Sequence, residues 1–223
     1  MINFNFNSFQ RLHASVLLAV TFGLILLIAR VYVTQSTFYV FLVWNLFLAC
    51  VPYGISQLAR YSKTIRSSGF LSGGAFLLWL VFFPNSPYII TDLIHLHSKN
   101  STLLWFDLFL VFIFAINGLL VGLLSLLDVF EVLRQRYSLR IAHYSIFQLC
   151  ILCGYGIYVG RFLRFNSWDI LTQPISLLKE MAYSFYSPHI GLFTFAFGGF
   201  IWVLFLVFQA LVPSQQTVGE LRK

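Results

Sequence analysis

The hydrophobic positions of this chain gather into six long runs, which short segments with charged or turn-forming residues separate. All but one of the runs have about 20 residues or more, the length that an α-helix needs to cross a hydrocarbon core of about 30 Å. The pattern predicts an all-α fold, a polytopic transmembrane helix bundle of about six spans, with residues 1–223 forming a single transmembrane domain. The expected spans are residues 14–33, 38–58, 70–83, 103–127, 141–160 and 189–212.

The composition excludes a soluble protein and argues against a nucleic-acid-binding one. Hydrophobic residues make up 59% of the chain and charged residues only 9%, whereas soluble domains carry about 25% charged residues. The net charge is +7, but the Lys and Arg residues lie in short segments between the runs, as orientation signals do. The first run meets Arg30 where a signal peptide would have a small-residue cleavage site, so we expect a retained span. The expected partner is the lipid bilayer, with no nucleic acid.

The placement of Lys and Arg predicts which side of the membrane each segment faces. In a six-span chain four of the segments share one side, and these hold nine Lys and Arg residues against five on the other side. The four segments are residues 1–13, 59–69, 128–140 and 213–223. Because positive residues accumulate on the cytoplasmic side, both termini are expected in the cytoplasm. The segments 84–96 and 161–188 are then expected to face outward.

The third run is short and ends in two prolines. Residues 70–83 make about 21 Å of helix, which is less than the thickness of the hydrocarbon core. Pro84 and Pro87 each lack a backbone donor and discourage a continuous helix. Ser86 is expected to cap a new helix whose first residue is Pro87. Two arrangements follow: a kinked long span, or a broken or re-entrant helix near 84–96 whose second half lies in the outer interface.

Polar residues follow these prolines at helical spacing. Placed on an α-helix, one arc of about 100° holds Tyr88, Thr91, Asp92 and His95. An Asp and a His beside membrane-length apolar runs are costly to bury, so they indicate a functional site.

Two interpretations of this polar stripe stay open. In the chemical one, Asp92 and His95 are an acid–base pair or weak metal-ligand candidates, with His97 or Asp107 as the third group. In the structural one, Asp92 pairs with an Arg, His95 bonds a backbone carbonyl and Tyr88 lies at the membrane interface.

A second polar motif, residues 160–169, follows the fifth run. Arg161 and Arg164 are three residues apart, so at a helix end they are expected to share a face and hold a phosphate or carboxylate. The structural alternative is that one of them pairs with Asp92 or Asp107. Asn166 and Asp169 have the spacing of a helix cap, and Trp168 is typical of an interfacial anchor.

An amphipathic segment follows this motif. Residues 170–186 are expected to form an outward interfacial helix on the membrane surface. Its apolar positions are Leu171, Ile175, Leu178, Met181 and Phe185.

Small and polar residues inside the spans indicate close helix packing. Asn45 and Asn117 are expected to form interhelical hydrogen bonds. Close backbone approach is expected at Gly118, Gly122, Gly154, Gly156 and Gly160.

The two polar motifs together resemble a known family. The patterns PNxPYIxTDLxHL, from Pro84, and GRFxRxNSWD, from Gly160, resemble an uncharacterised bacterial membrane family, the domain of unknown function 1361, which includes cyanobacterial and Gram-positive members. The resemblance spans about the second to the sixth run. It implies an integral protein of the bacterial inner or plasma membrane, or of the thylakoid in a cyanobacterium. It supplies no activity, substrate or cofactor.

The leading functional interpretation is an outward-facing pocket that binds a polar or anionic group: a lipid head group, a solute or the loop of a partner membrane protein. The protein would act as a transport or assembly component, and transport by so short a chain would need a homo-oligomer. The alternative is a membrane-embedded hydrolase or transferase, with His95 as general base, Asp92 orienting it and both arginines holding phosphate. The candidate ligand-binding residues are Asn85, Tyr88, Thr91, Asp92, His95, Arg161, Arg164, Asn166, Trp168 and Asp169.

Overall fold

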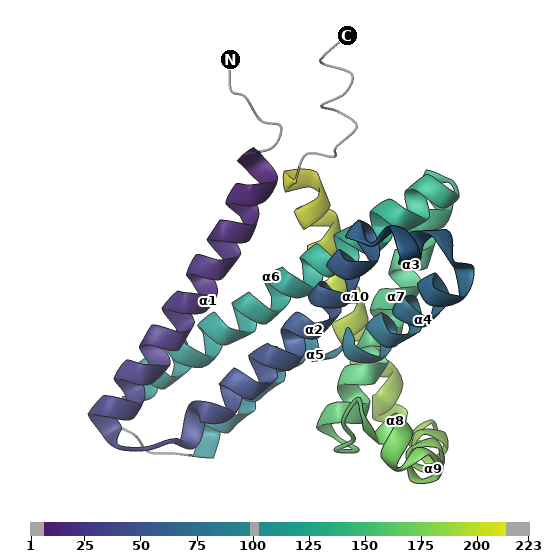
Figure 1. Ribbon diagram of the computed structural model, residues 1–223. Coiled ribbons are helices and arrows are strands. Elements are labelled where there is room, and N and C mark those ends of the chain that lie inside the picture. Colours follow the sequence, from purple (N-terminus) through teal and green to yellow (C-terminus); the bar gives the residue numbers. More distant parts are fainter. Residues whose placement is uncertain (1–6, 99–102, 213–223) are drawn as a thin grey trace.

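A computed structural model describes residues 7–98 and 103–212, without the side chains of residues 7–13, 95, 97, 98 and 188. The described residues form α-helices and 3₁₀-helices and no strand (Figure 1). The elements are α1 (Asn7–Thr34), η1 (Phe38–Val40), α2 (Phe41–Tyr61), α3 (Lys63–Ser67), α4 (Gly69–Phe82), α5 (Asn85–Tyr88), η2 (Ile89–Ser98), α6 (Leu104–Arg136), α7 (Leu139–Arg161), α8 (Asp169–Thr172), α9 (Pro174–Ser184) and α10 (Pro188–Leu211).

Six helical stretches of the described chain are long and apolar enough to cross a membrane. They are Ala14–Thr34, Phe38–Tyr61, Gly69–Ile94, Leu104–Arg136, Leu139–Arg161 and His189–Leu211. The predicted all-α polytopic bundle is confirmed, and the chain is an integral membrane protein. The start of α1 and the end of α10 lie at the same end of the bundle as α3, whereas α8 and α9 lie at the opposite end (Figure 1).

Two of the stretches are longer than the expected spans. The third stretch continues to Ile94: α4 ends at Phe82, and after a break at Pro84, which keeps helical backbone angles of φ −58° and ψ −25°, α5 and η2 follow. The fourth helix continues to Arg136, through most of the segment expected to be a loop at 128–140. Three of its charged residues there form ion pairs: Arg134 Nη2 lies 2.6 Å from Glu131 Oε2. Asp128 contacts Arg60 of α2 at 2.7 Å.

Helix α6 is the centre of the bundle. In its most apolar segment of 18 residues, 67% of the residues are buried, a larger share than in any of the other five stretches. One core cluster packs α6 against α4, α7 and α10 around the fully buried Trp79, Ile146 and Phe205. The other packs the N-terminal half of α6 against α1, α2 and η2 around Leu42 and Phe114.

Helices α7 and α10 approach each other closely at two glycines. A Cβ atom added at Gly154 would clash with the backbone carbonyl of Thr194, and one at Gly198 would lie 2.8 Å from the carbonyl oxygen of Cys150. Small residues at a helix interface let backbones approach, which is a common basis of packing inside membranes. The close packing predicted at Gly154 is therefore confirmed.

Helix α1 is attached to α6 by polar contacts inside the apolar bundle. Arg30 Nε lies 2.6 Å from Asp107 Oδ1, and both side chains are buried. The Arg30 guanidinium also lies 5.3 Å from the centre of the Tyr39 ring. Asn117 Nδ2 donates to the carbonyl of Ala19 at 3.0 Å, so the predicted interhelical bond is confirmed. Asp107, a candidate partner of Arg161 or Arg164 and a candidate third metal ligand, is instead paired with Arg30.

Removing one member of this ion pair should destabilise the fold more than removing both. Arg30→Met leaves the Asp107 carboxylate buried without its guanidinium, at a cost of roughly 3 kcal/mol in the free energy of unfolding. The double variant Arg30→Met/Asp107→Leu removes the buried charge and should unfold at a higher temperature than Arg30→Met. Thermal unfolding of the detergent-purified proteins checks this order. Equal melting temperatures for the two variants would contradict it.

Candidate functional site

The chain between α4 and η2 stays inside the bundle, where its polar groups find partners. Ser86 Oγ donates to the carbonyl of Ala49 on α2 at 2.8 Å, and Ser86 is fully buried. Helix α5 begins at Asn85 and has no side-chain cap. The predicted cap at Ser86, with Pro87 as first helical residue, is therefore wrong, because the hydroxyl bonds α2 and not its own helix.

A glycine surface on α6 makes room for this segment. A Cβ atom added at Gly118 would lie 2.5 Å from the carbonyl oxygen of Ser86, and one at Gly122 would lie 2.7 Å from the Ser86 Cβ. The backbone of α5 thus rests directly on the backbone of α6. The break in the third stretch depends on this contact, since irregular backbone at membrane depth is tolerated only inside protein or against a water-filled cavity.

Residues 89–98 form a 3₁₀-helix, which has three residues per turn. Residues three apart therefore share a face, and Ile89 and Asp92 are both buried. Thr91 lies on a different face from Asp92 and donates to the carbonyl of Tyr88 at 2.7 Å. The predicted single arc of polar side chains is wrong, because it assumed α-helical spacing.

The candidate metal ligands are not brought together among the described side chains. The side chains of His95 and His97 lie outside the described part of the structure. The described residues include no group of three or more His, Cys, Asp or Glu that could hold a metal ion. Asp92 and Asp107 each contact an arginine.

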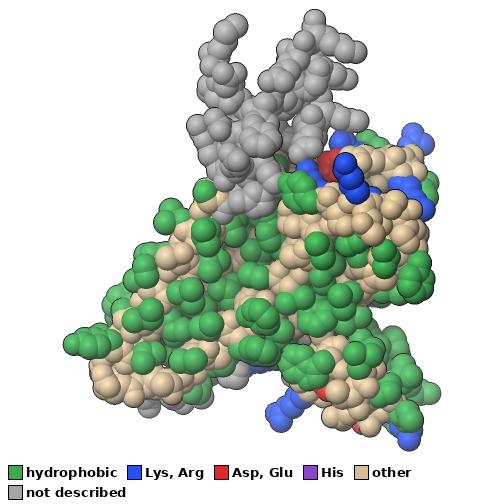
Figure 2. Space-filling model, in the orientation of Figure 1, with side chains coloured by type: hydrophobic (Ala, Val, Ile, Leu, Met, Phe, Trp, Pro, Cys, Tyr) green, Lys and Arg blue, Asp and Glu red, His purple; other side chains and the backbone are tan. Residues whose placement is uncertain are grey.

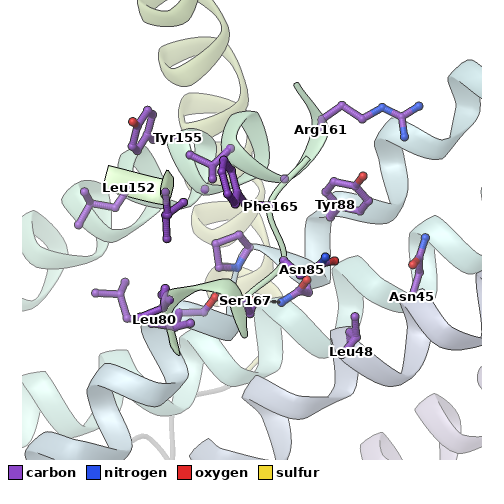
Figure 3. A pocket seen from close by; sticks show the side chains of 18 of the residues that line it. Asn45, Leu48, Leu80, Asn85, Tyr88, Leu152, Tyr155, Arg161, Phe165 and Ser167 are labelled. Carbon is purple, nitrogen blue, oxygen red and sulfur yellow. Dashed lines mark hydrogen bonds between the residues drawn. The ribbon is translucent and has the colours of Figure 1, made fainter. Parts of the chain in front are cut away.

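A cavity of about 450 Å³ opens between the break in the third stretch, the end of α7 and helices α8 and α9 (Figure 3). Among the candidate site residues, its lining includes Asn85, Tyr88, Asp92, Arg161 and Asn166. Thr91, Arg164, Trp168 and Asp169 are not part of that lining.

Asp92 is the buried centre of the polar wall. Its carboxylate accepts a hydrogen bond from Asn45 Nδ2 at 2.7 Å. Arg161 Nη1 lies 3.5 Å from the other oxygen, Asp92 Oδ1. The predicted pairing of Asp92 with an arginine of the second motif and the predicted interhelical bond of Asn45 are both confirmed. These contacts connect α2, η2 and α7 through one carboxylate.

The turn after α7 is attached to the break by two polar side chains. Asn85 Nδ2 donates to Ser167 Oγ at 2.9 Å, and Ser167 Oγ donates to the carbonyl of Val81 at 3.1 Å (Figure 3). Trp168 lies edge-on to Trp44 of α2, with ring centres 6.3 Å apart. The two sequence motifs therefore meet in space, although about 80 residues separate them.

Arg164 has a different environment from Arg161. Helix α7 ends at Arg161, and Arg164 lies beyond it with a left-handed backbone, φ +61°. Its side chain is exposed. The helical face that the two arginines were predicted to share does not exist, because the chain leaves the helix between them.

Asp169 is the first residue of α8, and its carboxylate bonds the turn before that helix. Its carboxylate accepts from the backbone N–H of Asn166 at 2.7 Å and from the Thr172 hydroxyl at 2.9 Å. These donors, the backbone N–H first, hold the pKa of the Asp169 carboxyl below its usual range. The predicted helix cap is wrong, because Trp168 is the residue before α8 and makes no side-chain cap bond; Asn166 and Asp169 are in contact, but the contact closes the preceding turn.

The amphipathic segment forms two helices, α8 and α9, which the chain joins at Gln173. Four of its predicted apolar side chains are exposed: Leu171, Ile175, Leu178 and Phe185. Met181 is half-buried and lines the cavity, as does the buried Leu177. Tyr155 OH lies 3.2 Å from Ser184 Oγ, which connects α9 to α7.

Several cavity residues could not be singled out from the sequence. Tyr155, Phe165 and Leu80 have the same character as many other apolar positions in the spans. The sequence does single out Asn45, because a polar residue in the middle of a span needs a hydrogen-bond partner. Its position in the span does not indicate that it lines a cavity.

The contact between α5 and α6 can be tested with a pair of Gly→Ala variants. Gly118→Ala places a methyl group against the Ser86 carbonyl and should lower the melting temperature. Gly74→Ala in α4 is the matched control, because a Cβ atom there has nothing within 4 Å. It should stabilise the protein by about 0.5–1 kcal/mol, through the lower backbone entropy of the unfolded chain. A Gly118→Ala variant as stable as Gly74→Ala would show that α5 does not rest on α6.

The comparison with known proteins identifies the family. Residues 44–206 match the family described as a protein of unknown function, DUF1361. No curated protein and no solved structure matches the chain. The match covers more than half of the chain and includes both polar motifs, in agreement with the resemblance of those motifs. The chain therefore belongs to the DUF1361 family.

Proposed function

We propose that the cavity faces outward and binds a polar or anionic group, and that the protein acts as a transport or assembly component of the membrane. The observation that carries the proposal is the position of Arg161. Its side chain belongs to the lining of a cavity large enough for a small ligand, and it is the more exposed partner of the ion pair with Asp92.

The preference for an anion follows from the unequal exposure of the two charges in the wall. The Asp92 side chain is 2% exposed and lies behind Asn45, whereas the Arg161 side chain is 14% exposed. A ligand entering the cavity therefore meets the guanidinium before the carboxylate. Guanidinium groups bind phosphate and carboxylate oxygens through several N–H donors. Asn85 and Tyr88 add neutral polar groups to the same wall.

The outward orientation is supported by the surface charge. Lys and Arg side chains gather at the end of the molecule where α3 and the turn between α6 and α7 lie (Figure 2). Positive residues mark the cytoplasmic side of membrane proteins. The cavity is lined in part by Ile170 of α8 and by Leu177 and Met181 of α9. Helices α8 and α9 lie at the other end of the molecule (Figure 1).

The enzymatic alternative receives less support. A hydrolase or transferase with a two-arginine phosphate clamp needs Arg161 and Arg164 in one site, and Arg164 is not part of the cavity lining. The proposal is therefore binding without catalysis.

Two arginine variants test the binding proposal. Arg161→Gln should weaken the binding of methyl phosphate or of hexyl phosphate at least tenfold, because it removes a charge-assisted contact. Arg164→Gln is the matched control and should bind as the wild type does. Native mass spectrometry of the delipidated protein with each phosphate measures the affinities. The double variant Arg161→Gln/Asp92→Asn leaves no unpaired carboxylate, so its loss of binding would not be a consequence of unfolding. Equal affinities in wild type, Arg161→Gln and the double variant would refute the proposal.

The orientation is tested separately with single cysteines in a background lacking Cys50, Cys150 and Cys153. Lys63→Cys should react with a membrane-impermeant maleimide only after the membrane is opened, because the cytoplasmic side is closed to the reagent. Lys179→Cys in α9 should react in intact cells. The reverse labelling pattern would place the cavity on the cytoplasmic side.

A further inference from the structure

We infer that the ligand of this cavity is an amphiphile, with an anionic head at Arg161 and an apolar chain that lies between α4, α7 and α9. The inference rests on the proposed function and specifies its ligand: a membrane lipid or a related single-chain amphiphile, and not a free solute.

The cavity has a polar end and an apolar end. Arg161, Tyr88 and Asn45 lie on one side, whereas Leu80, Leu152 and Tyr155 lie on the other (Figure 3). Leu177 and Met181 of α9 belong to the same lining. Phe165 stands between the two ends, with Asn85 on the polar side of it (Figure 3). The described charged side chains of the lining, Asp92 and Arg161, are both at the polar end.

The direction of the cavity matches that of a lipid in the membrane. Leu152 lies nine residues before Arg161 on α7, which corresponds to about 13 Å along the helix axis. Arg161 ends the spanning helix, so we expect it near the depth of the head groups, whereas Leu152 lies within the span. On α4 the order is the same, since Leu80 precedes the break and Asn85 follows it. A chain that enters with its head at Arg161 therefore points toward the centre of the bilayer.

The neighbouring helices place the cavity beside lipid. Leu171, Ile175 and Leu178 of α8 and α9 are exposed apolar side chains, as expected of helices that lie in the membrane interface. Leu152 itself is half exposed. Since the apolar end is bounded by side chains at the lipid-facing surface, an acyl chain reaches it from the leaflet without crossing water. A small anion would fill the polar end alone and leave water against the leucines, which is unfavourable.

The chain-length dependence of binding tests the inference. Methyl phosphate and hexyl phosphate share the head group, and hexyl phosphate adds five methylene groups. Burial of a methylene strengthens binding by up to about fourfold. We therefore expect hexyl phosphate to bind at least tenfold more tightly than methyl phosphate in native mass spectrometry of the delipidated wild-type protein.

A matched pair of variants on α9 locates the chain. Met181→Asn puts an amide into the apolar end and should abolish the preference for hexyl phosphate, so that the two phosphates bind with similar affinity. Leu178→Asn changes an exposed side chain of the same helix that is not part of the lining, and it should keep the preference. The melting temperature of each variant is measured alongside, and comparable values attribute the change to the cavity.

The outcomes separate this inference from the function on which it rests. If both phosphates bind equally and Arg161→Gln weakens the binding of both, the inference of an amphiphilic ligand is overturned and the proposed anion-binding function is supported. If the preference for hexyl phosphate survives in Met181→Asn, the chain does not lie between α7 and α9 and the inference is overturned. If neither phosphate binds, both proposals fail. Binding of both phosphates that requires Arg161, together with a preference for hexyl phosphate that requires Met181, supports both proposals.

Discussion

The backbone contact between α5 and α6 is the constraint on which the rest of this structure depends. Inside a membrane every backbone polar group needs a partner within the protein, so a broken helix is stable only where other elements enclose it. Gly118 and Gly122 remove the side chains that would keep α5 away, and Ser86 then bonds the α2 backbone. The break at Pro84 consequently lies within the bundle and turns the polar residues after it toward α2 and α7.

Three buried aspartates form ion pairs between elements of the bundle. Asp92, Asp107 and Asp128 each contact an arginine of a different helix. The partners are Arg161, Arg30 and Arg60. A buried carboxylate without a cation is costly, and replacing such pairs by apolar residues is often neutral for stability. These pairs therefore act mainly on which arrangement of the helices forms, and less on the free energy of unfolding. Each aspartate disfavours arrangements that separate it from its arginine. The pair at Asp92 differs from the other two because Arg161 also borders a cavity.

The polar end of the cavity is built by the two polar motifs, whereas its apolar end is built mainly by residues outside them. The motifs supply Asn85, Asp92, Arg161 and the turn that Ser167 attaches to the break. The apolar end is formed by hydrophobic residues of the spans, such as Leu80 and Leu152, and by residues of α9. The proposal of an amphiphilic ligand rests on this difference between a polar end, which contains Arg161, and an apolar end.

The sequence by itself determined the six spans, the family and the two segments that build the site, because hydrophobic periodicity and motif spacing are local properties of the chain. It also indicated that the buried charge of Asp92 needs an arginine. Only the tertiary structure decided that Asp107 belongs to Arg30, 77 residues earlier, and that Arg161 rather than Arg164 lines the cavity. The 3₁₀ geometry after Tyr88 and the left-handed backbone at Arg164 moved side chains off the faces that α-helical spacing predicts. The physical reason is that partner choice and local departures from the α-helix follow from how the helices pack, and packing depends on contacts between distant parts of the chain.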